Sequence, residues 1–218
     1  MDDTPLLRIR RQLALAVGEN AVFDGWSTAA VDSAALALGV NLDVARLAFP
    51  TAPAAMIAAY VEGVDAALEA EFPVEAMVAM RVSQRIRAIL LKRFALMGPA
   101  REAIRSGLAI LAMPQNLPSA ARLGWHSADL MWRIAGDSAT DLNHYSKRAI
   151  LASIYAASLL IWIDDDSEAQ AETAAFIDRR LAGVARFERA KAGWFGSPER
   201  RPSVALFLGR LRYPPRKA

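Results

Sequence analysis

The chain has 218 residues, of which 54% are hydrophobic and 22% charged, and it contains no cysteine. This composition predicts a packed helical protein, and it excludes a disordered chain, a disulfide framework and any site built on thiols. The net charge of +3 is unevenly placed, because residues 189–218 carry eight basic residues and one acidic residue, whereas the rest of the chain is acidic overall.

The first seventy residues predict three short helices followed by a longer one. Apolar residues recur there at helical spacing, and no run of alternating β-branched residues predicts a strand. Ser27 and Thr51 each stand before an apolar-periodic segment, so both are placed to cap a helix. The expected helices cover residues 6–17, 27–38, 42–48 and 51–71.

Proline, glycine and acidic clusters divide the rest of the chain into further helices, about ten in all, with no strand. The acidic run at residues 164–166 is expected to be a solvated turn, with Asp166 or Ser167 capping the next helix. Residues 149–163 carry no charge, but a spanning helix needs about 20 residues, so we expect a core helix. The start shows no secretory signal, and a bacterial cytoplasmic location is the simplest expectation.

The order of helices and turns in residues 1–50 resembles the amino-terminal lobe of TetR-type regulators, a three-helix DNA-binding unit. The charge of this segment argues against DNA binding, because its four arginines are outnumbered by six acidic residues. A recognition helix must lie among phosphates and present polar side chains to bases, whereas residues 42–48 offer one arginine, one aspartate and apolar residues. We expect a retained scaffold without nucleic-acid binding, and a ligand-responsive TetR-type regulator is the alternative.

The end of the chain carries a short basic amphipathic segment. Four apolar residues at positions i, i+3, i+4 and i+7 form one stripe, and two arginines flank it. Such a segment binds the interface of an anionic bilayer, although it could also pack on the protein's own body or on a second subunit. The expected membrane-contact residues are Val204, Phe207, Leu208, Arg210, Leu211 and Arg212.

Residues that carry catalytic chemistry are few. His126 and Asp129, and likewise Asp141 and His144, are three residues apart and share a helical face. A di-iron bundle needs further glutamate ligands that have no evident source here, and no nucleophile elbow, phosphate loop or dinucleotide fingerprint occurs. The sequence predicts a protein that is not an enzyme and holds no metal.

The middle of the chain carries the most distinctive motifs. It reads MPQNLP from Met113, DLMWRIAGD from Asp129 and TDLNHYSKRA from Thr140. These motifs closely resemble the Coq-nine family of ubiquinone-biosynthesis proteins over about residues 105–190. The family usually has tryptophan where this chain has His144, and an exposed tryptophan is a natural interface anchor.

The resemblance implies a homodimer with a TetR-like fold, an apolar pocket for an isoprenoid or quinone-type lipid, and a di-iron demethoxyubiquinone hydroxylase as partner. It implies no cofactor other than this lipid ligand. The partner-binding candidates, carried over by motif, are Asp129, Met131, Asp141, Asn143, His144, Tyr145 and Arg148. The apolar residues expected to line the lipid pocket, which would fit the protein core equally well, are Leu108, Leu111, Met113, Leu130, Trp132, Ile150, Ile154 and Leu159.

We therefore predict an all-α, TetR-like helical bundle in three parts. Residues 1–50 form a helix-turn-helix-like lobe, residues 51–195 a lipid-binding and partner-binding body, and residues 196–218 a basic amphipathic tail. The expected function is that of a non-catalytic accessory protein of ubiquinone biosynthesis. It would bind a prenylated quinone precursor at the inner membrane and present it to the hydroxylase. A peripheral lipid-binding protein outside the quinone pathway is the second alternative.

Overall fold

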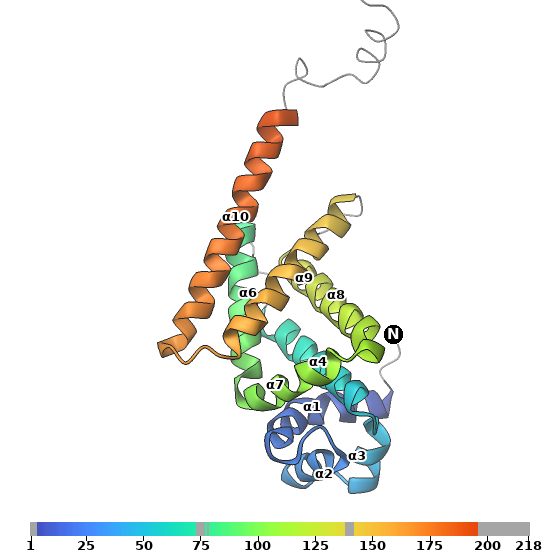
Figure 1. The fold of residues 1–218 in the computed structure, drawn as a ribbon. Coiled ribbons are helices and arrows are strands. Elements are labelled where there is room, and N and C mark those ends of the chain that lie inside the picture. Colours follow the sequence, from blue (N-terminus) through green and yellow to red (C-terminus); the bar gives the residue numbers. More distant parts are fainter. Residues whose placement is uncertain (1–3, 73–76, 78, 138–141, 196–218) are drawn as a thin grey trace, which may run out of the picture. The chain divides into compact units, whose positions relative to one another are not determined.

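The computed structural model describes residues 4–72, 77, 79–137 and 142–195. These residues form nine α-helices and three short 3-10 helices, and none of them forms a strand (Figure 1). The predicted all-α class is therefore confirmed.

Three helices make up the amino-terminal lobe, and local capping explains where two of them begin. The Ser27 side chain accepts a hydrogen bond from the backbone N–H of Ala29, as predicted, and Asn41 caps the third helix. The first helix runs seven residues beyond its predicted end, to Asp24, and is followed by Gly25, whose φ of 65° favours glycine. The helices are α1 (Pro5–Asp24), α2 (Thr28–Ala37) and α3 (Leu42–Ala48).

Six further α-helices follow the lobe in the described chain. The residue before α4 is Ala52, which has no side-chain cap, so the prediction that Thr51 caps this helix is wrong. Pro53 begins α4 instead, because a proline at the first helical position has its φ already set and lacks an N–H that would go unpaired. The helices are α4 (Pro53–Glu71), α6 (Val82–Met97), α7 (Arg101–Leu111), α8 (Leu117–Ile134), α9 (Leu142–Trp162) and α10 (Ala171–Phe195), with 3-10 helices η1 (Gly98–Ala100), η2 (Pro114–Asn116) and η3 (Glu168–Gln170).

The helices α1 and α4 cross closely because glycines stand at their contact. A Cβ atom at Gly63 would lie 2.1 Å from Cβ of Ala14, and one at Gly18 would lie 2.3 Å from the ring of Tyr60. Only a residue without a side chain leaves room at these points. This crossing fixes α4, and with it Tyr60, against the amino-terminal lobe.

The turn after α9 differs from the expected solvated turn. Asp165 is buried, and its carboxylate accepts hydrogen bonds from the N–H of Thr173 at 2.8 Å and from the hydroxyls of Thr173 and Ser167. Burial alone raises the pKa of Asp165, but the bonds from Ser167 and Thr173 outweigh it and lower that pKa to about 2. The prediction of a solvated acidic run is therefore wrong for Asp165. Ser167 does accept a bond from the N–H of Glu172 at the start of α10.

Contacts divide the chain into a compact unit up to Ile177 and a second unit from Asp178 onward. The boundary expected at residue 50 falls inside the first unit, so the amino-terminal lobe packs with the helices that follow it. Among the described residues, no single helix is both long and apolar enough to cross a membrane, and α3 and α4 meet that test only jointly, across a 95° bend.

Candidate functional site

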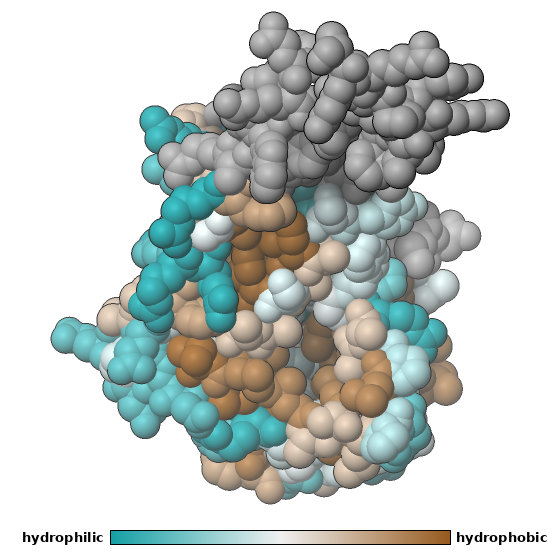
Figure 2. All heavy atoms as spheres, turned by 45° about the horizontal axis from the view of Figure 1, so that its top comes forward, coloured by the Kyte–Doolittle hydropathy of each residue, from teal (hydrophilic) through white to brown (hydrophobic). Residues whose placement is uncertain are grey.

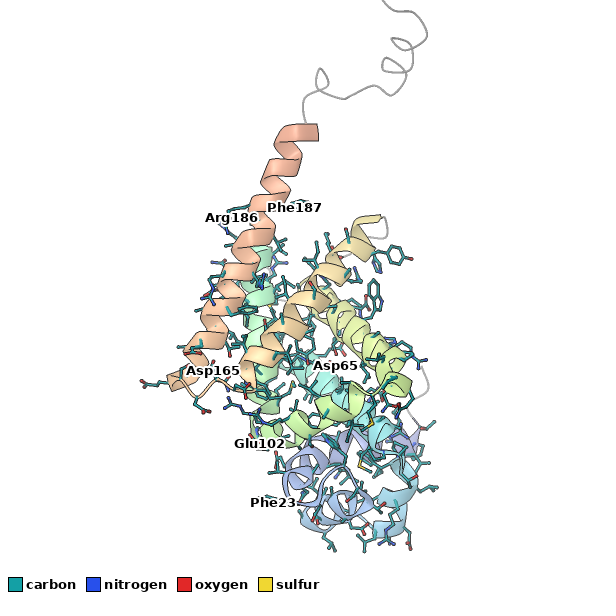
Figure 3. All side chains as sticks on the ribbon, in the orientation of Figure 1. Phe23, Asp65, Glu102, Asp165, Arg186 and Phe187 are labelled. Atoms are coloured by element: carbon teal, nitrogen blue, oxygen red, sulfur yellow. The ribbon has the colours of Figure 1, made fainter. Side chains whose placement is uncertain are left out.

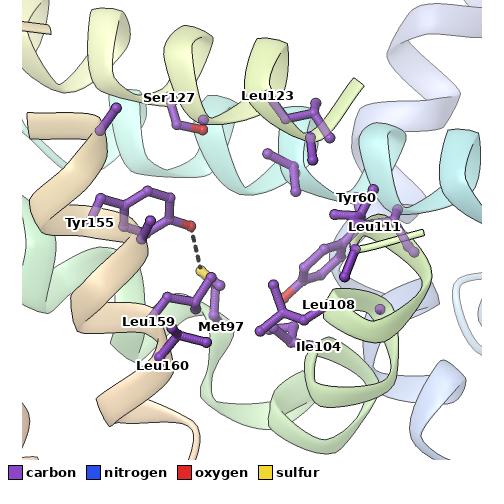
Figure 4. Close-up of a pocket in the computed structure, with 18 of the residues that line it drawn as sticks. Tyr60, Met97, Ile104, Leu108, Leu111, Leu123, Ser127, Tyr155, Leu159 and Leu160 are labelled. Carbon is purple, nitrogen blue, oxygen red and sulfur yellow. Dashed lines mark hydrogen bonds between the residues drawn. The ribbon is translucent and has the colours of Figure 1, made fainter. Parts of the chain in front are cut away.

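An apolar cavity of about 360 Å³ lies among the helices of the first unit (Figure 4). Its walls come from α4, α7, α8 and α9, with contributions from the turn before α2 and from the end of α6. Figure 2 shows that apolar side chains also gather on the surface of one face of the molecule, with hydrophilic side chains around them. A cavity of this size and lining suits an apolar ligand, because such sites are lined mainly by hydrophobic and aromatic side chains.

Polar atoms in the cavity wall are few. The Trp26 indole N–H donates to the carbonyl of Ala103 at 2.8 Å, and its ring lies 5.4 Å from that of Tyr60. The hydroxyl of Tyr60 is buried and has no hydrogen-bond partner among the described residues. Burial raises the pKa of Tyr60, so this phenol stays neutral. The Tyr155 hydroxyl lies 3.8 Å from the sulfur of Met97 (Figure 4).

A buried charge network stands behind one wall of the cavity. The Arg93 side chain has no exposed surface, and its guanidinium pairs with the carboxylate of Asp65. Asp65, which lies on α4, is labelled in Figure 3. Arg93 also donates to the hydroxyl of Ser127 at 3.0 Å and lies over the ring of Tyr155, 4.9 Å from its centroid. Both Ser127 and Tyr155 line the cavity. The network therefore fixes α4, α6, α8 and α9 around the cavity through charged groups that must remain paired.

Three of the eight residues predicted to bind lipid line this cavity, namely Leu108, Leu111 and Leu159. Leu130 and Ile154 are buried but lie elsewhere in the core, whereas Met113 is exposed. The remaining two, Ile150 and Trp132, are partly exposed and also do not line the cavity. For these five residues the structure does not support a place in the pocket.

The motifs of α8 and α9 build a cluster of ion pairs. Arg148, which is buried, donates to Asp129 at 2.5 Å and to Asp137 at 3.2 Å. Lys147 reaches Asp137 at 2.6 Å and lies over the ring of Trp132, whose N–H donates to the Lys147 carbonyl. Burial alone raises the pKa of Asp129 and of Asp137, but the ion pairs with Arg148 and Lys147 outweigh burial and lower both pKa values. The cluster clamps the end of α8 to the start of α9.

The predicted partner-binding residues divide into surface and core. Tyr145 is exposed, and its ring lies beside those of His144 and Trp125, at 5.1 Å and 6.2 Å between centroids. Met131 is fully buried, so the prediction that it contacts a partner is wrong, because the side chain has no surface to offer. Arg148 is held in the ion pairs between α8 and α9, with almost no exposed surface.

Other predicted residues lie outside what the structure describes. Asp141 and the side chain of Asn143 are among them. The six tail residues predicted to contact the membrane are too, namely Val204, Phe207, Leu208, Arg210, Leu211 and Arg212. Within the described ranges, no group of three or more His, Asp or Glu side chains could hold a metal ion.

Several cavity residues were not predicted from the sequence. Trp26, Ile57 and Tyr60 come from the first sixty residues, far in sequence from the motifs. Met97 and Ile104 come from the helices between. The apolar periodicity of these segments marks a buried face, but only the tertiary fold determines which buried positions face a cavity.

Comparison with known proteins gives relatives of one kind. Residues 117–188 match the family model described as COQ9. The chain is 29% identical over 181 residues to "Ubiquinone biosynthesis protein COQ9, mitochondrial" of Rattus norvegicus, covering 80% of this chain and 58% of that protein. The protein of the same name from Homo sapiens is 35% identical over 101 residues, covering 46% of this chain and 32% of that protein. The chain thus spans less than two thirds of the length of either relative.

A solved structure resembles the fold. It is described as the TetR transcriptional regulator from Nitrosomonas europaea ATCC 19718, with a TM-score of 0.63 and 20% sequence identity. The match covers 82% of this chain and 98% of the regulator. The chain therefore has a TetR-like all-α fold. The resemblance to the COQ9 family that the motifs predict is also confirmed. The segment that matches the family contains α8, α9 and α10 up to residue 188.

Proposed function

We propose that this protein is a non-catalytic accessory factor of ubiquinone biosynthesis that binds a prenylated quinone precursor and presents it to a hydroxylase. The observation that carries the proposal is the position of the apolar cavity. Two of its walls, α8 and α9, fall within residues 117–188, the segment that matches the COQ9 family. The relatives are named for ubiquinone biosynthesis, and ubiquinone precursors carry an apolar prenyl chain that suits such walls.

Physical chemistry explains why such a factor is useful. A prenylated precursor lies within the bilayer, and removing it exposes apolar surface at about 0.8 kcal/mol per methylene. An enzyme that works from the aqueous side therefore has difficulty drawing the ring out of the membrane. A cavity lined by Leu108, Leu111, Leu123 and Leu159 offers replacement burial for part of the lipid and lowers this barrier.

The surface that receives the hydroxylase is proposed to lie around Tyr145. Tyr145, His144 and Trp125 form an exposed or partly exposed aromatic group, and aromatic side chains are frequent anchors of protein interfaces. The ion pairs of Arg148 position this group by holding α8 to α9. A di-iron demethoxyubiquinone hydroxylase, a homodimeric state and a peripheral location on the cytoplasmic face of a bacterial inner membrane remain predictions.

The experiment that tests the function is the quinone profile of a strain lacking the protein, measured by mass spectrometry of lipid extracts. We expect depleted ubiquinone together with accumulated demethoxyubiquinone or another under-hydroxylated prenylated precursor. Complementation with the full chain should restore the profile, and a chain lacking residues 198–218 should restore less if the tail contacts the membrane. A normal profile in the deletion strain would contradict the role in ubiquinone biosynthesis and favour a lipid-binding protein outside that pathway.

The alternative of a TetR-type regulator rests on the fold alone. In the helix that would read DNA, the exposed residues Val44 and Leu47 are apolar. The guanidinium of Arg46 forms a bidentate pair with Asp32, with N–O distances of 2.8 and 2.7 Å. Base reading needs polar side chains that are available to the groove. Specific retardation of a DNA fragment by the purified protein would restore this alternative.

A further inference from the structure

The hydroxyl of Tyr60 differs from the other polar groups of the cavity wall. Of the lining residues that the structure describes, four carry a polar side-chain group, namely Trp26, Tyr60, Ser127 and Tyr155. The Trp26 indole donates to a backbone carbonyl, the Ser127 hydroxyl bonds to both members of the buried ion pair, and the Tyr155 hydroxyl lies beside a sulfur atom. The Tyr60 hydroxyl has no partner among the described residues, although the residue is only 1% exposed.

The fold itself gives no reason for this hydroxyl. A buried donor without a partner destabilises a protein, because it loses its hydrogen bonds to water and gains none in return. Phenylalanine would fill the same part of the wall without that loss. Buried polar groups without a partner are rare in folded proteins, so each one requires an explanation. A ligand atom that accepts the hydrogen bond provides one.

Neighbouring residues fix the position of the phenol. Tyr60 lies on α4, and its ring occupies the space that Gly18 leaves on α1, where a Cβ atom would come within 2.3 Å of the ring. The Trp26 ring packs against it with 5.4 Å between centroids and a tilt of 60°. In Figure 4 the hydroxyl ends of Tyr60 and Tyr155 face each other from opposite sides of the cavity. The Tyr60 hydroxyl is therefore held where a ligand in the cavity can reach it.

The phenol of Tyr60 acts as a donor at this position. Burial, the largest effect on this group, raises the pKa of Tyr60, so the hydroxyl keeps its proton at neutral pH. A neutral phenol offers one O–H, which suits an acceptor oxygen such as that of a carbonyl, an ether or a second hydroxyl. A ligand made only of hydrocarbon would leave this O–H buried and unpaired.

We infer that Tyr60 determines which ligand the cavity accepts: its hydroxyl donates a hydrogen bond to an acceptor oxygen on the part of the ligand that enters. This inference rests on the proposed function and deepens it, because it assigns an oxygen-bearing ring, and not the hydrocarbon chain, to the space beside Tyr60. A site that hydrogen-bonds its ligand rejects an analogue that lacks the bonding atom, since the protein group is then left unpaired. Tyr60 thus separates an oxygenated ring from a hydrocarbon of the same shape.

The test compares two probes of nearly identical shape. Acetophenone carries a carbonyl oxygen, and α-methylstyrene has a methylene group in its place. Binding of each probe to the full chain and to the variant Tyr60→Phe is measured by isothermal titration calorimetry. We expect Tyr60→Phe to weaken acetophenone binding about threefold to tenfold and to leave α-methylstyrene binding within about twofold.

A spectroscopic measurement reports the hydrogen bond directly. The carbonyl stretching band of bound, isotope-labelled acetophenone should lie at a lower frequency in the wild-type protein than in Tyr60→Phe, because a donated hydrogen bond weakens the C=O bond. A merely structural role of Tyr60 would not produce this difference. Melting curves establish that the variant is folded.

The matched control within the cavity is Tyr155→Phe. It removes the other phenol of the wall, whose hydroxyl already lies 3.8 Å from the Met97 sulfur, so the ratio of the two affinities should stay within about twofold of the wild-type ratio. Equal losses of both probes in Tyr60→Phe, an unchanged carbonyl band, or wild-type protein that binds neither probe would overturn the inference. A normal quinone profile together with carbonyl-selective binding would remove only the ubiquinone pathway. Depleted ubiquinone without that selectivity would remove only the role of Tyr60.

Discussion

Arg93 and Asp65 form a buried ion pair, and replacing one partner should cost more stability than replacing the other. Arg93 has no exposed side-chain surface, whereas the Asp65 side chain keeps 16% of its exposure. Removing one partner of a buried ion pair costs about 3–5 kcal/mol, because the other charge is left buried and unpaired. Asp65→Asn strands the fully buried guanidinium and should lower the free energy of unfolding by about 3 kcal/mol.

The reverse substitution should cost less. Arg93→Met fills the same space with apolar atoms and leaves Asp65 in contact with solvent and with the Ser127 hydroxyl at 3.2 Å. We expect a loss of about 1–2 kcal/mol. The double variant should be no less stable than Asp65→Asn alone, because it contains no stranded charge and apolar replacement of a buried pair is often neutral.

Urea unfolding followed by circular dichroism measures these differences, provided that the slope of free energy against urea stays constant. A loss below about 1 kcal/mol for Asp65→Asn would show that the guanidinium is not dependent on this carboxylate. Additive losses in the double variant would show that the two side chains do not act as a pair. Either result would refute the assignment of the network as the support of the cavity wall.

Three further predictions concern single residues. Asp165→Asn should remove about 2 kcal/mol at neutral pH, because the fold lowers the pKa of Asp165 from 3.8 to about 2. That contribution is complete above about pH 4 and is lost as the pH falls toward 2, so acid urea melts of the variant and wild type should converge. Gly63→Ala should lower the free energy of unfolding by about 1–3 kcal/mol, because its Cβ would lie 2.1 Å from Cβ of Ala14. The control is Gly183→Ala, whose Cβ would meet nothing within 4 Å, and it should lose no stability in the same melts. Tyr60→Phe removes a hydroxyl without a partner among the described residues, so the melting temperature should stay unchanged or rise, and a clear fall would contradict the reasoning.

Local signals explain what the sequence predicts well. Ser27 stands before an alanine-rich helix, and α3 is bounded by Asn41 and by Phe49-Pro50, so both helix starts follow from caps and breakers within a few residues. The motifs of residues 113–149 indicated the family for the same reason, since they are contiguous in sequence. Thr51 fails as a cap because Pro53 sets the start of α4 two residues later.

The cavity could be predicted only in part, because periodicity marks a buried face without distinguishing core from void. Ile154 and Leu159 both lie on the buried side of α9, yet only Leu159 lines the cavity. Met131 shares its motif with Asp129, which is partly exposed, and is itself fully buried. Asp165 belongs to an acidic run that predicts a solvated turn, but Thr173, eight residues later, supplies the donors that let it be buried.

The amino-terminal lobe has a structural role that is independent of DNA. Trp26 lies in the turn that leads into α2, yet its indole donates to the carbonyl of Ala103 on α7 and its ring lines the cavity beside Tyr60. The crossing of α1 and α4 at Gly18 and Gly63 leaves room for the Tyr60 ring against α1. Removing the lobe would therefore open the cavity wall and expose α4. The lobe therefore contributes to the cavity wall through Trp26, whatever its outer surface contacts.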